Sequence, residues 1–220
     1  MTLYDCKYET YRYYCNPFLL NLVPQGVKVL DVGCSGGQFG EQLILHKGCT
    51  VFGVDISANA IEDAQKRLHS ALQMNIEEDT FPFADQYFDL VIFGDVLEHL
   101  RDPASVLSDF SSHLKPDGML LTSLPNVAHI GIRIRLFCGR WNYQSSGIMD
   151  DSHLRFFTLT TARKMLRDAG FEIIRFDVSP KLNTRLLRHL PFLTGLVKGL
   201  CKLFPRLLAY QFLFLCRRHQ

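Results

Sequence analysis

The chain has 220 residues, of which 47% are hydrophobic and 21% are charged, a composition that excludes intrinsic disorder and collagen-like repeats and is typical of one globular domain of enzyme size. Lysine and arginine number 24 against 22 aspartate and glutamate, and this formal charge of +2 gives no reason to expect a nucleic-acid-binding protein. The charge is unevenly divided, because eight of the basic residues and none of the acidic ones lie in residues 181–220.

The cysteines and the apolar segments indicate the compartment. Seven scattered cysteines form no CxxC pair, which predicts reduced thiols in a cytoplasmic protein and disfavours a zinc site or a disulfide scaffold. No uncharged stretch exceeds 15 residues, whereas a transmembrane helix needs roughly 20 apolar residues. Asp5, Lys7 and Glu9 stand where a signal peptide would need an apolar run. We therefore expect neither a membrane span nor a secretion signal.

Short apolar runs alternate with helical patterns along most of the chain. The tyrosine-rich start, which leads into residues 17–22, predicts a helical cap over residues 1–24. Runs rich in Val, Ile and Phe then predict seven strands, over residues 27–32, 50–55, 71–74, 88–93, 119–123, 171–178 and 209–216. The alternation predicts a single α/β domain over residues 1–220, a Rossmann-like doubly wound fold with a mostly parallel seven-stranded sheet and helices on both faces.

Two helices have clear boundary signals. Asp102 followed by Pro103 is typical of an N-cap and the first helical residue, and predicts a helix that ends near Leu114. Thr158 predicts the start of another helix, which Gly170 ends.

Residues 181–208 interrupt the alternation before the last predicted strand. Leucines are interleaved with lysine and arginine there, and Pro191, Gly195, Gly199 and Pro205 predict a break into short pieces. Such a basic, leucine-rich insert can lie in an anionic membrane interface. It equally fits a helical pair that covers an acceptor site or a subunit interface, and the sequence leaves the oligomeric state open.

A glycine-rich turn follows the first predicted strand, in residues 29–40 (VLDVGCSGGQFG). Gly33 and Gly37 would let backbone amides approach a ligand. Asp31 is unfavourable for a pyrophosphate but suits the ammonium group of a cofactor with an amino-acid tail. Asp55 ends the next strand, 22 residues after Gly33, where a carboxylate can accept hydrogen bonds from ribose hydroxyls. The alternatives are a nicotinamide-binding turn and a structural pair of turn carboxylates.

These motifs resemble those of the class I S-adenosylmethionine-dependent methyltransferases over most of the chain. The resemblance implies that S-adenosylmethionine is bound by Asp31, Gly33, Ser35, Gly37, Asp55, Ile56, Asn75, Ile76 and Asp95. Ser35 replaces the usual middle glycine, and Asn75 replaces the aspartate that commonly receives the adenine amino group. Ser35 is small and the Asn75 carbonyl can accept the same hydrogen bond, so we expect cofactor binding to persist.

Asp95, Glu98 and His99 follow the fourth predicted strand at positions i, i+3 and i+4, which face one side of a helical turn. This DxxEH resembles the ExxEH of ubiquinone-pathway O-methyltransferases and small-RNA 2′-O-methyltransferases, where these residues can hold a divalent metal. The segment around His153 resembles the one that supplies a further histidine in the RNA enzymes. The resemblance implies a metal site of Asp95, Glu98, His99 and His153, whose mixed donors suit Mn, Fe, Co or Zn better than Mg.

Without a metal, His99 is the preferred general base, because an imidazole with a pKa of about 6.5 can accept a proton at neutral pH. Glu98 lies beside it in sequence, and His129 is the second candidate. Each also fits a structural role: Glu98 and His99 can simply line the cofactor pocket, and a lone loop histidine is commonly structural.

Residues 124–158 resemble a bacterial subgroup associated with surface-saccharide and lipid-linked biosynthesis. Trp141 and Tyr143 could stack on a sugar or quinone ring, or pack against the sheet. We therefore predict methyl transfer from S-adenosylmethionine to a hydroxyl of a small molecule, a saccharide or a lipid-linked acceptor, by a cytoplasmic enzyme with a candidate membrane contact. The alternatives are N- or C-methylation of a small metabolite, a non-catalytic S-adenosylmethionine-binding subunit, and a nicotinamide dehydrogenase, which Asp31 disfavours.

Overall fold

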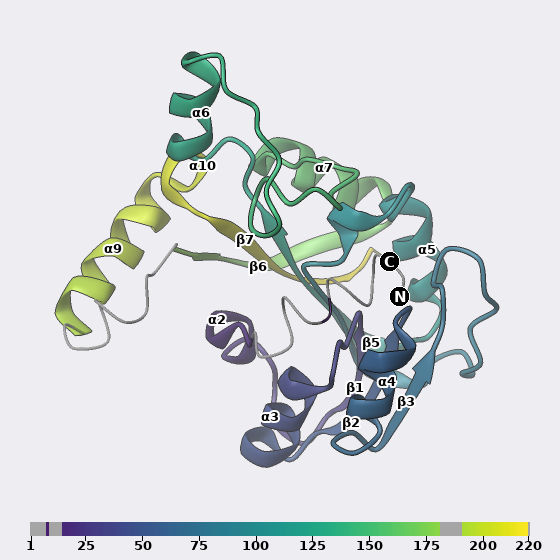
Figure 1. Ribbon diagram of the computed structural model, residues 1–220. Helices are drawn as coiled ribbons and strands as arrows, with labels where there is room; N and C mark the ends of the chain where they lie inside the picture. The colour runs from purple at the N-terminus through teal and green to yellow at the C-terminus, as the bar shows by residue number, and fades with distance from the viewer. Residues whose placement is uncertain (1–7, 9–14, 181–190, 220) are drawn as a thin grey trace.

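Seven strands pair into one sheet in the order β3-β2-β1-β4-β5-β7-β6 (Figure 1). The computed structural model describes residues 8, 15–180 and 191–219. The strands are β1 (Lys28–Val32), β2 (Thr50–Asp55), β3 (Ser70–Gln73), β4 (Phe88–Gly94), β5 (Leu114–Pro125), β6 (Phe171–Ser179) and β7 (Gln211–Arg218). Neighbouring strands from β3 to β5 are parallel, and β7 is antiparallel to both β5 and β6. The predicted Rossmann-like, mostly parallel sheet is thus confirmed.

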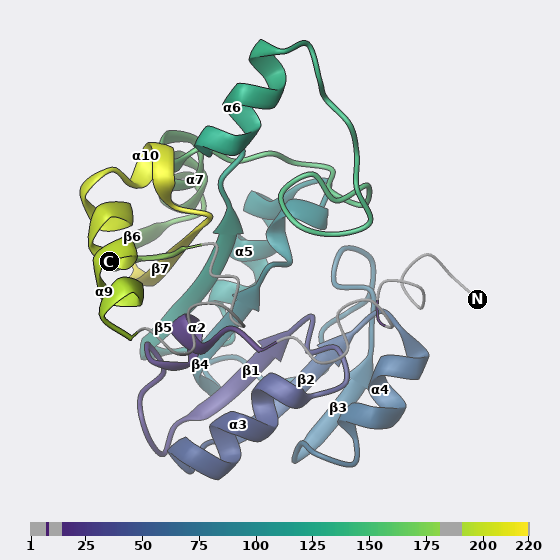
Figure 2. The same ribbon diagram turned by 60° about the vertical axis from the view of Figure 1, so that its left-hand side comes forward.

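Helices cover both faces of this sheet (Figures 1 and 2). On one face, α5 (Pro103–Ser111) and α7 (Leu159–Asp168) bury leucine, valine and alanine side chains in a core that includes Phe93 and Phe214. On the other face, α2 (Pro17–Leu20), α3 (Gln38–Lys47) and α4 (Ala58–Ala64) form a second core with Val29 and Leu90. The remaining elements are the 3₁₀ turn η1 (Leu97–His99), α6 (Ile130–Phe137), α9 (Pro191–Leu203) and α10 (Pro205–Leu208).

The boundary signals of α5 and α7 act as the sequence predicts. The Asp102 side chain accepts a hydrogen bond from the Ser105 amide. Pro103 is the first helical residue, where the missing N–H of proline leaves no donor unsatisfied. Thr158 forms a capping box with Thr161. Gly170 follows α7 with φ of +82°, a conformation that glycine adopts without steric cost.

Several predicted boundaries are wrong. The helix predicted to end near Leu114 is α5, which ends at Ser111, because Leu114 already pairs with Phe88 in the sheet. β5 begins at Leu114 instead of residue 119, because its first residues already pair with β4, with a register irregularity between Phe88 and Leu90. The last strand begins two residues later than predicted, at Gln211, because residues 205–208 form α10. The predicted break of the insert at Gly195 and Gly199 is also wrong, since α9 continues through both glycines. A glycine costs only about 1 kcal/mol in a helix interior, which packing against β6 can offset.

The ends of the predicted segments fall partly outside the described residues. Residues 181–190 of the insert and most of the predicted cap over residues 1–24 are among those that the structure does not describe. Within the described part of the cap, α2 begins after Asn16, whose side chain accepts hydrogen bonds from the amides of Phe18 and Leu19. Among the helices of the described residues, none is long and apolar enough to cross a lipid bilayer.

Asn126, just after β5, joins the sheet to α10. It is fully buried, and its Nδ2 donates to the Ala209 carbonyl at 2.8 Å, with longer contacts of 3.5 Å to the Pro205 and Arg206 carbonyls. Its Oδ1 accepts from the Ala128 amide at 3.0 Å. The side-chain amide therefore satisfies both the end of α10 and the turn that leads into α6.

We expect Asn126→Asp to destabilise the protein by about 3 kcal/mol or more, because an acceptor oxygen would replace the donor that faces three carbonyl oxygens. Urea unfolding followed by circular dichroism would measure this. The matched control is Asn142→Asp at an exposed position, which should change the unfolding free energy by less than about 0.5 kcal/mol. Equal effects of the two substitutions would contradict the role assigned to Asn126.

Candidate functional site

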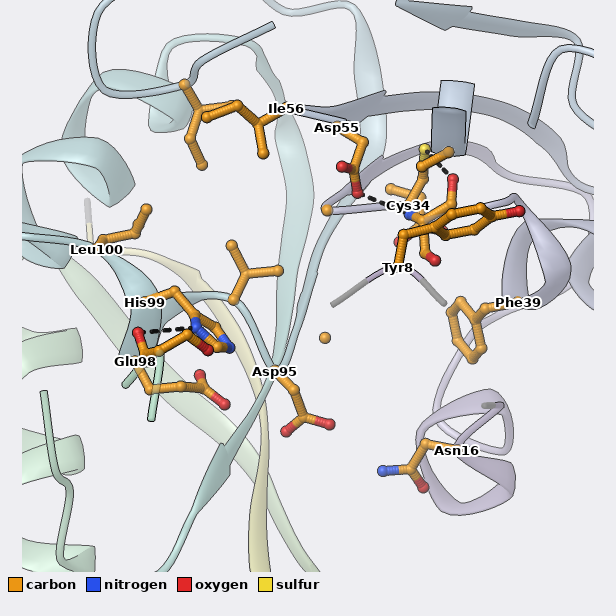
Figure 3. Close-up of a pocket in the computed structure, with 18 of the residues that line it drawn as sticks. Tyr8, Asn16, Cys34, Phe39, Asp55, Ile56, Asp95, Glu98, His99 and Leu100 are labelled. Carbon is orange, nitrogen blue, oxygen red and sulfur yellow. Dashed lines mark hydrogen bonds between the residues drawn. The ribbon is translucent and has the colours of Figure 1, made fainter. Parts of the chain in front are cut away.

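A cavity of about 450 Å³ opens at the carboxyl ends of β1, β2 and β4 (Figure 3). It lies where the strand order reverses between β1 and β4, the usual ligand position in open α/β sheets. In the described part of the chain, five buried side-chain nitrogen or oxygen atoms have no hydrogen-bond partner, and four belong to residues that line this cavity: Asp31, Ser35, Gln38 and Glu98. Buried polar atoms are normally satisfied, so this concentration indicates a site for a polar ligand.

The glycine-rich turn forms one wall of the cavity. The amides of Gly33 and Cys34 both donate to the Val54 carbonyl, at 2.8 and 3.0 Å, which ties the turn to the end of β2. Gly33 and Gly37 have φ of +69° and +80°, and Ser35 has φ of +49°, so the serine occupies a left-handed conformation that glycine would adopt more easily. The departure from the family pattern at Ser35 is therefore accommodated without loss of the turn.

Asp31 lies at the base of this turn. It is buried, and its Oδ2 has no hydrogen-bond partner. Burial, and secondarily the nearby Asp55 carboxylate, raise the pKa of Asp31 to about 7. A carboxylate in this setting favours a cationic group as its neighbour.

Asp55 links the turn to α4. Its Oδ2 accepts from the Ser35 amide and its Oδ1 from the Ser57 amide, both at 2.9 Å, which is the turn-capping role that the sequence left open. An ionised carboxylate can accept further hydrogen bonds, so this role does not exclude binding of a diol. Asn75 also forms a turn, because its Oδ1 accepts from the Glu77 amide at 3.2 Å. Ile56 and Ile76 line the cavity beside Asp55 and Asn75.

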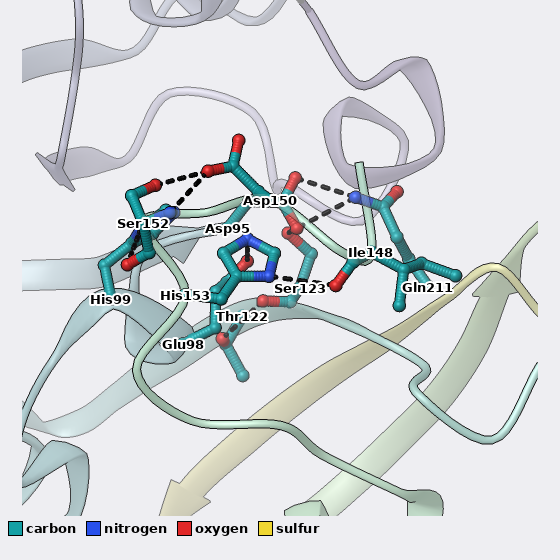
Figure 4. A network of polar contacts seen from close by, with 10 residues as sticks. All are labelled: Asp95, Glu98, His99, Thr122, Ser123, Ile148, Asp150, Ser152, His153 and Gln211. Atoms are coloured by element: carbon teal, nitrogen blue, oxygen red, sulfur yellow. Dashed lines mark hydrogen bonds and ion pairs between the residues drawn. The ribbon is translucent and has the colours of Figure 1, made fainter. Parts of the chain in front are cut away.

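Glu98, His99 and His153 meet at the opposite wall, where one ligand atom of each lies within 4.8 Å of the others (Figure 4). Glu98 is 1% exposed, and burial, followed by the charges of Asp95 and Asp150, raises its pKa well above the usual range. The Nδ1 atoms of His99 and His153 lie 3.2 and 3.1 Å from the Ser152 and Ile148 carbonyl oxygens. Because a carbonyl only accepts, each Nδ1 carries a proton, and Nε2 has the lone pair in the neutral ring.

Asp95 lines the same cavity but contacts other residues than the Glu98, His99 and His153 cluster. Its carboxylate accepts from Ser123 Oγ at 2.9 Å and from Gln211 Nε2 at 2.8 Å, and its backbone is left-handed with φ of +57°. Burial raises the pKa of Asp95 to about 6, although these two hydrogen bonds act in the opposite direction. The structure thus brings together three of the four residues that the resemblance implies as metal ligands, and holds Asp95 against β5 and β7.

His129 is not brought to the cavity. It precedes α6, and its Nδ1 accepts from the Gly131 amide at 3.1 Å, so that it caps the helix. Its ring packs edge-on against Tyr210, with centroids 5.9 Å apart. Among the described residues that line the cavity, His99 and His153 are the histidines, and these contacts favour a structural role for His129.

Sequence reasoning missed several lining residues from distant parts of the chain. Tyr8, Asn16, Gln38, Tyr210 and Gln211 all line the cavity. Asn16 Nδ2 donates to Gln211 Oε1 at 3.1 Å, and Gln211 donates in turn to Asp95. No local pattern marks Asn16 or Gln211, because their contacts join residues more than 100 positions apart in the sequence.

The chain is similar to a family of known proteins. A family model described as a methyltransferase domain matches residues 8–175. The ubiquinone biosynthesis O-methyltransferase of Pasteurella multocida is 36% identical over 131 residues, which cover 50% of this chain and 54% of that protein. The enzyme of the same name from Neisseria meningitidis serogroup C is 34% identical over 124 residues, 50% of this chain and 51% of that protein. The chain thus spans about half the length of the curated relatives that it matches.

Solved structures support the fold. An S-adenosylmethionine-dependent methyltransferase from Mesorhizobium loti has a TM-score of 0.64 at 17% identity, with 92% of this chain and 96% of that chain covered. A methyltransferase from Archaeoglobus fulgidus has a TM-score of 0.61 at 19% identity, with 97% and 94% covered. At these identities the likeness concerns the fold alone.

The close packing of Gly33 generates a stability prediction. A Cβ at Gly33 would lie 2.4 Å from Val96 Cγ2, whereas a Cβ at Gly26, which has nearly the same φ of +70°, would meet nothing within 4 Å. We expect Gly26→Ala to cost about 1–2 kcal/mol for the left-handed backbone alone, and Gly33→Ala to cost at least twice as much. Urea unfolding of both variants would measure the difference, and Val96→Ala should restore part of the loss in Gly33→Ala. Equal losses at the two glycines would contradict the predicted overlap.

Proposed function

The chain belongs to the class I S-adenosylmethionine-dependent methyltransferases, and from this premise we propose that it transfers the methyl group to a hydroxyl oxygen. The single observation that carries the proposal is the arrangement of the cavity. Three of its four unpartnered buried polar atoms, those of Asp31, Ser35 and Gln38, lie on its β1 side, and the Glu98, His99 and His153 cluster lies on its η1 side. One wall can therefore hold a cofactor while the other receives the acceptor.

The proposed cofactor contacts are those that the resemblance implies. Asp31 would bind the ammonium group, Asp55 the ribose hydroxyls, and Asn75 with Ile76 the adenine. Gly33, Ser35 and Gly37 would bring the turn close to the cofactor, with Ile56 as an apolar wall. Asp95, which is fixed by Ser123 and Gln211, would face the region between cofactor and acceptor.

When bound, S-adenosylmethionine supplies a methyl group already activated by the sulfonium. The protein therefore has to align donor and acceptor, an effect worth up to about 7–11 kcal/mol in well-oriented systems. Without a metal, His99 is the proposed general base, because its Nδ1–H donates to the Ser152 carbonyl and fixes the ring in the tautomer whose lone pair is on Nε2. Glu98 would then position the acceptor, and His129 remains an alternative that its capping bond disfavours.

A divalent cation held by Glu98, His99 and His153 is the alternative to a histidine base, because a metal would occupy the Nε2 lone pair of His99. The residues fit a cation, since Glu98 Oε2 is buried without a partner and both histidines have their Nδ1 atoms against backbone carbonyls, the usual outer contacts of metal-binding imidazoles. His153 Nε2 and Glu98 Oε1 are 4.0 Å apart, too far for a hydrogen bond. Two nitrogens and a carboxylate suit Zn, Mn, Fe or Co, which would act as a Lewis acid on the acceptor oxygen.

The acceptor class is a small molecule, a saccharide or a lipid-linked hydroxyl. Its support is the family subgroup that residues 124–158 resemble and the similarity to relatives named ubiquinone biosynthesis O-methyltransferases. Trp141 and Tyr143 are exposed rather than packed against the sheet, and Trp141 contacts the Phe156 ring edge-on at 5.5 Å. Neither lines the cavity, so stacking on an acceptor ring there is not supported. N- or C-methylation and a non-catalytic role are the alternatives, which a methyl-transfer assay distinguishes.

The structure changes which residues of the segment 181–208 could make the predicted membrane contact. Lys198 and Lys202 bind Asp177 at 3.4 and 3.2 Å, and Lys198 Nζ also lies 4.7 Å from the centre of the Phe18 ring. These two lysines therefore neutralise a carboxylate of the sheet rather than extend toward headgroups. In the described part of the insert, a membrane contact would depend mainly on the exposed leucines of α9.

Cofactor binding should be coupled to proton release at Asp31. Because its pKa is raised to about 7, Asp31 is largely protonated at pH 6, and an ammonium group bound beside it requires the ionised form. We expect the affinity for S-adenosylhomocysteine to rise between about pH 6 and pH 8, with net proton release at the lower pH. Calorimetry in buffers of different ionisation enthalpy would measure both.

Asp31→Asn should abolish this proton release and weaken binding about 10- to 100-fold, the worth of a hydrogen bond to a charged group. The same calorimetry with NAD is the control for the dinucleotide alternative. Tight binding of NAD, with none of S-adenosylhomocysteine, would overturn the proposed function, and unchanged proton release in Asp31→Asn would overturn the role of Asp31.

The metal proposal has its own test. The purified protein should retain close to one Zn, Mn, Fe or Co per chain, measured by mass spectrometry of the elements, and Glu98→Gln should lose it because the neutral amide is a weaker ligand. Asp95→Asn is the matched control, since the Asp95 carboxylate is already bound by Ser123 and Gln211, and it should keep the metal. Methyl transfer that survives both chelation and Glu98→Gln would exclude a catalytic metal.

A further inference from the structure

An extended surface beside the cavity remains unexplained by the proposed reaction. Residues 130–146, here called the arm, comprise α6 and the chain that follows it, and every residue from 133 to 146 is exposed. Ile132 packs the arm against Ile148 and Met149, while Ile134, Leu136 and Phe137 face outward, with Phe137 93% exposed. α6 stands away from the sheet in both views (Figures 1 and 2). Exposed apolar residues in one group normally mark an interaction surface.

The charges of the arm indicate which partner it meets. No aspartate or glutamate occurs between Asp117 and Asp150, whereas Arg133, Arg135 and Arg140 lie on the exposed part of the arm. Trp141 and Tyr143 are also exposed. Segments that lie in a membrane interface typically combine exposed apolar side chains with tryptophan and tyrosine. Arginines in such segments attract anionic headgroups.

The outward face of α9 extends this surface. Leu196, Leu200 and Leu203 follow one side of the helix at spacings of four and three residues, and Phe204 comes next, all of them exposed. The lysines of α9 lie on another side of the helix, where both bind Asp177 of β6 and Lys202 is also half-exposed. The exposed surface of α9 is therefore largely apolar. α10, which continues from α9, lies at the base of α6, where Asn126 contacts its end (Figure 2).

We propose that the arm and the outward leucines of α9 form one docking surface for an anionic lipid bilayer, with Phe137 in the boundary between headgroups and acyl chains. The arm ends at Ser146, and Ser146, Gly147 and Ile148 line the cavity. An acceptor hydroxyl carried by a lipid would thus reach the cavity where the arm meets the membrane. This last point depends on the proposed function, whereas the docking surface itself does not.

Flotation of the full chain with vesicles tests the surface. We expect binding to vesicles that contain phosphatidylglycerol, little binding to pure phosphatidylcholine, and a loss of binding as salt is raised. Phe137→Ser should weaken binding about tenfold, because the ring leaves the acyl boundary. Arg135→Gln with Arg140→Gln should weaken it about fivefold for each arginine removed.

Matched controls separate this surface from general effects. Leu203 on α9 and Leu45 on α3 are both 68% exposed, so Leu203→Ser should weaken vesicle binding and Leu45→Ser should not. Arg167→Gln, at an exposed position of α7, is the control for charge. All variants should keep the circular dichroism spectrum and the urea unfolding midpoint of the wild type, which shows that each one folds.

Three results would overturn the docking surface. They are no flotation of the wild type with anionic vesicles, flotation unchanged by Phe137→Ser and the arginine variant, and a dimer in sedimentation that Phe137→Ser dissociates while vesicles do not bind. The last result would instead assign the surface to a second copy of the chain. Flotation that succeeds while S-adenosylhomocysteine fails to bind would support the surface and overturn the proposed function, so the two ideas fail separately.

Discussion

The structure depends on the gathering of carboxylates at one edge of a parallel sheet. Because β1, β2 and β4 end at the same edge, Asp31, Asp55 and Asp95 approach one another, and Glu98 follows one turn later. Burial raises the pKa of Asp31, Asp95 and Glu98. No lysine or arginine lines the cavity among the described residues. Such a site opposes a pyrophosphate and favours ligands that bring positive charge, which a sulfonium, an ammonium group and a metal cation all do.

Side-chain networks hold this arrangement of carboxylates. Asn16 caps α2 with its Oδ1 and donates through Nδ2 to Gln211, which donates to both oxygens of Asp95. Asp95 also accepts from Ser123 and is held in a left-handed backbone conformation that costs energy for a residue with a Cβ. These contacts therefore join α2, β7 and the end of β4 at one point. The position of Asp95 in the cavity therefore depends on β7 as much as on the motif residues.

Local signals explain which parts of the molecule the sequence could predict. The glycine-rich turn, Asp31 and Asp55 were accessible because a strand, a turn and a helix start lie within a few residues of one another. The approach of His153 to Glu98 and His99 was accessible only through the family resemblance, since 54 residues separate His153 from His99. Gln211 and Asn126 were not accessible, because each acts on a partner far away in the chain. The position of Asp95 outside the cluster has the same cause, since spacing along η1 says nothing of Ser123 or Gln211.

The effect of the uneven charge distribution depends on which groups each charged side chain contacts. Lys198 and Lys202 contribute to the basic character of the last forty residues, yet both bind Asp177, so they hold α9 to the sheet. The arm contributes three arginines to the acidic part of the chain, with no acidic residue between Asp117 and Asp150 to balance them. A count by segment therefore points to the insert, whereas the contacts point to the arm. Because an anionic surface attracts the charges that extend toward it rather than those bound to carboxylates, the arm supplies the main electrostatic attraction of the docking surface, and α9 supplies apolar area.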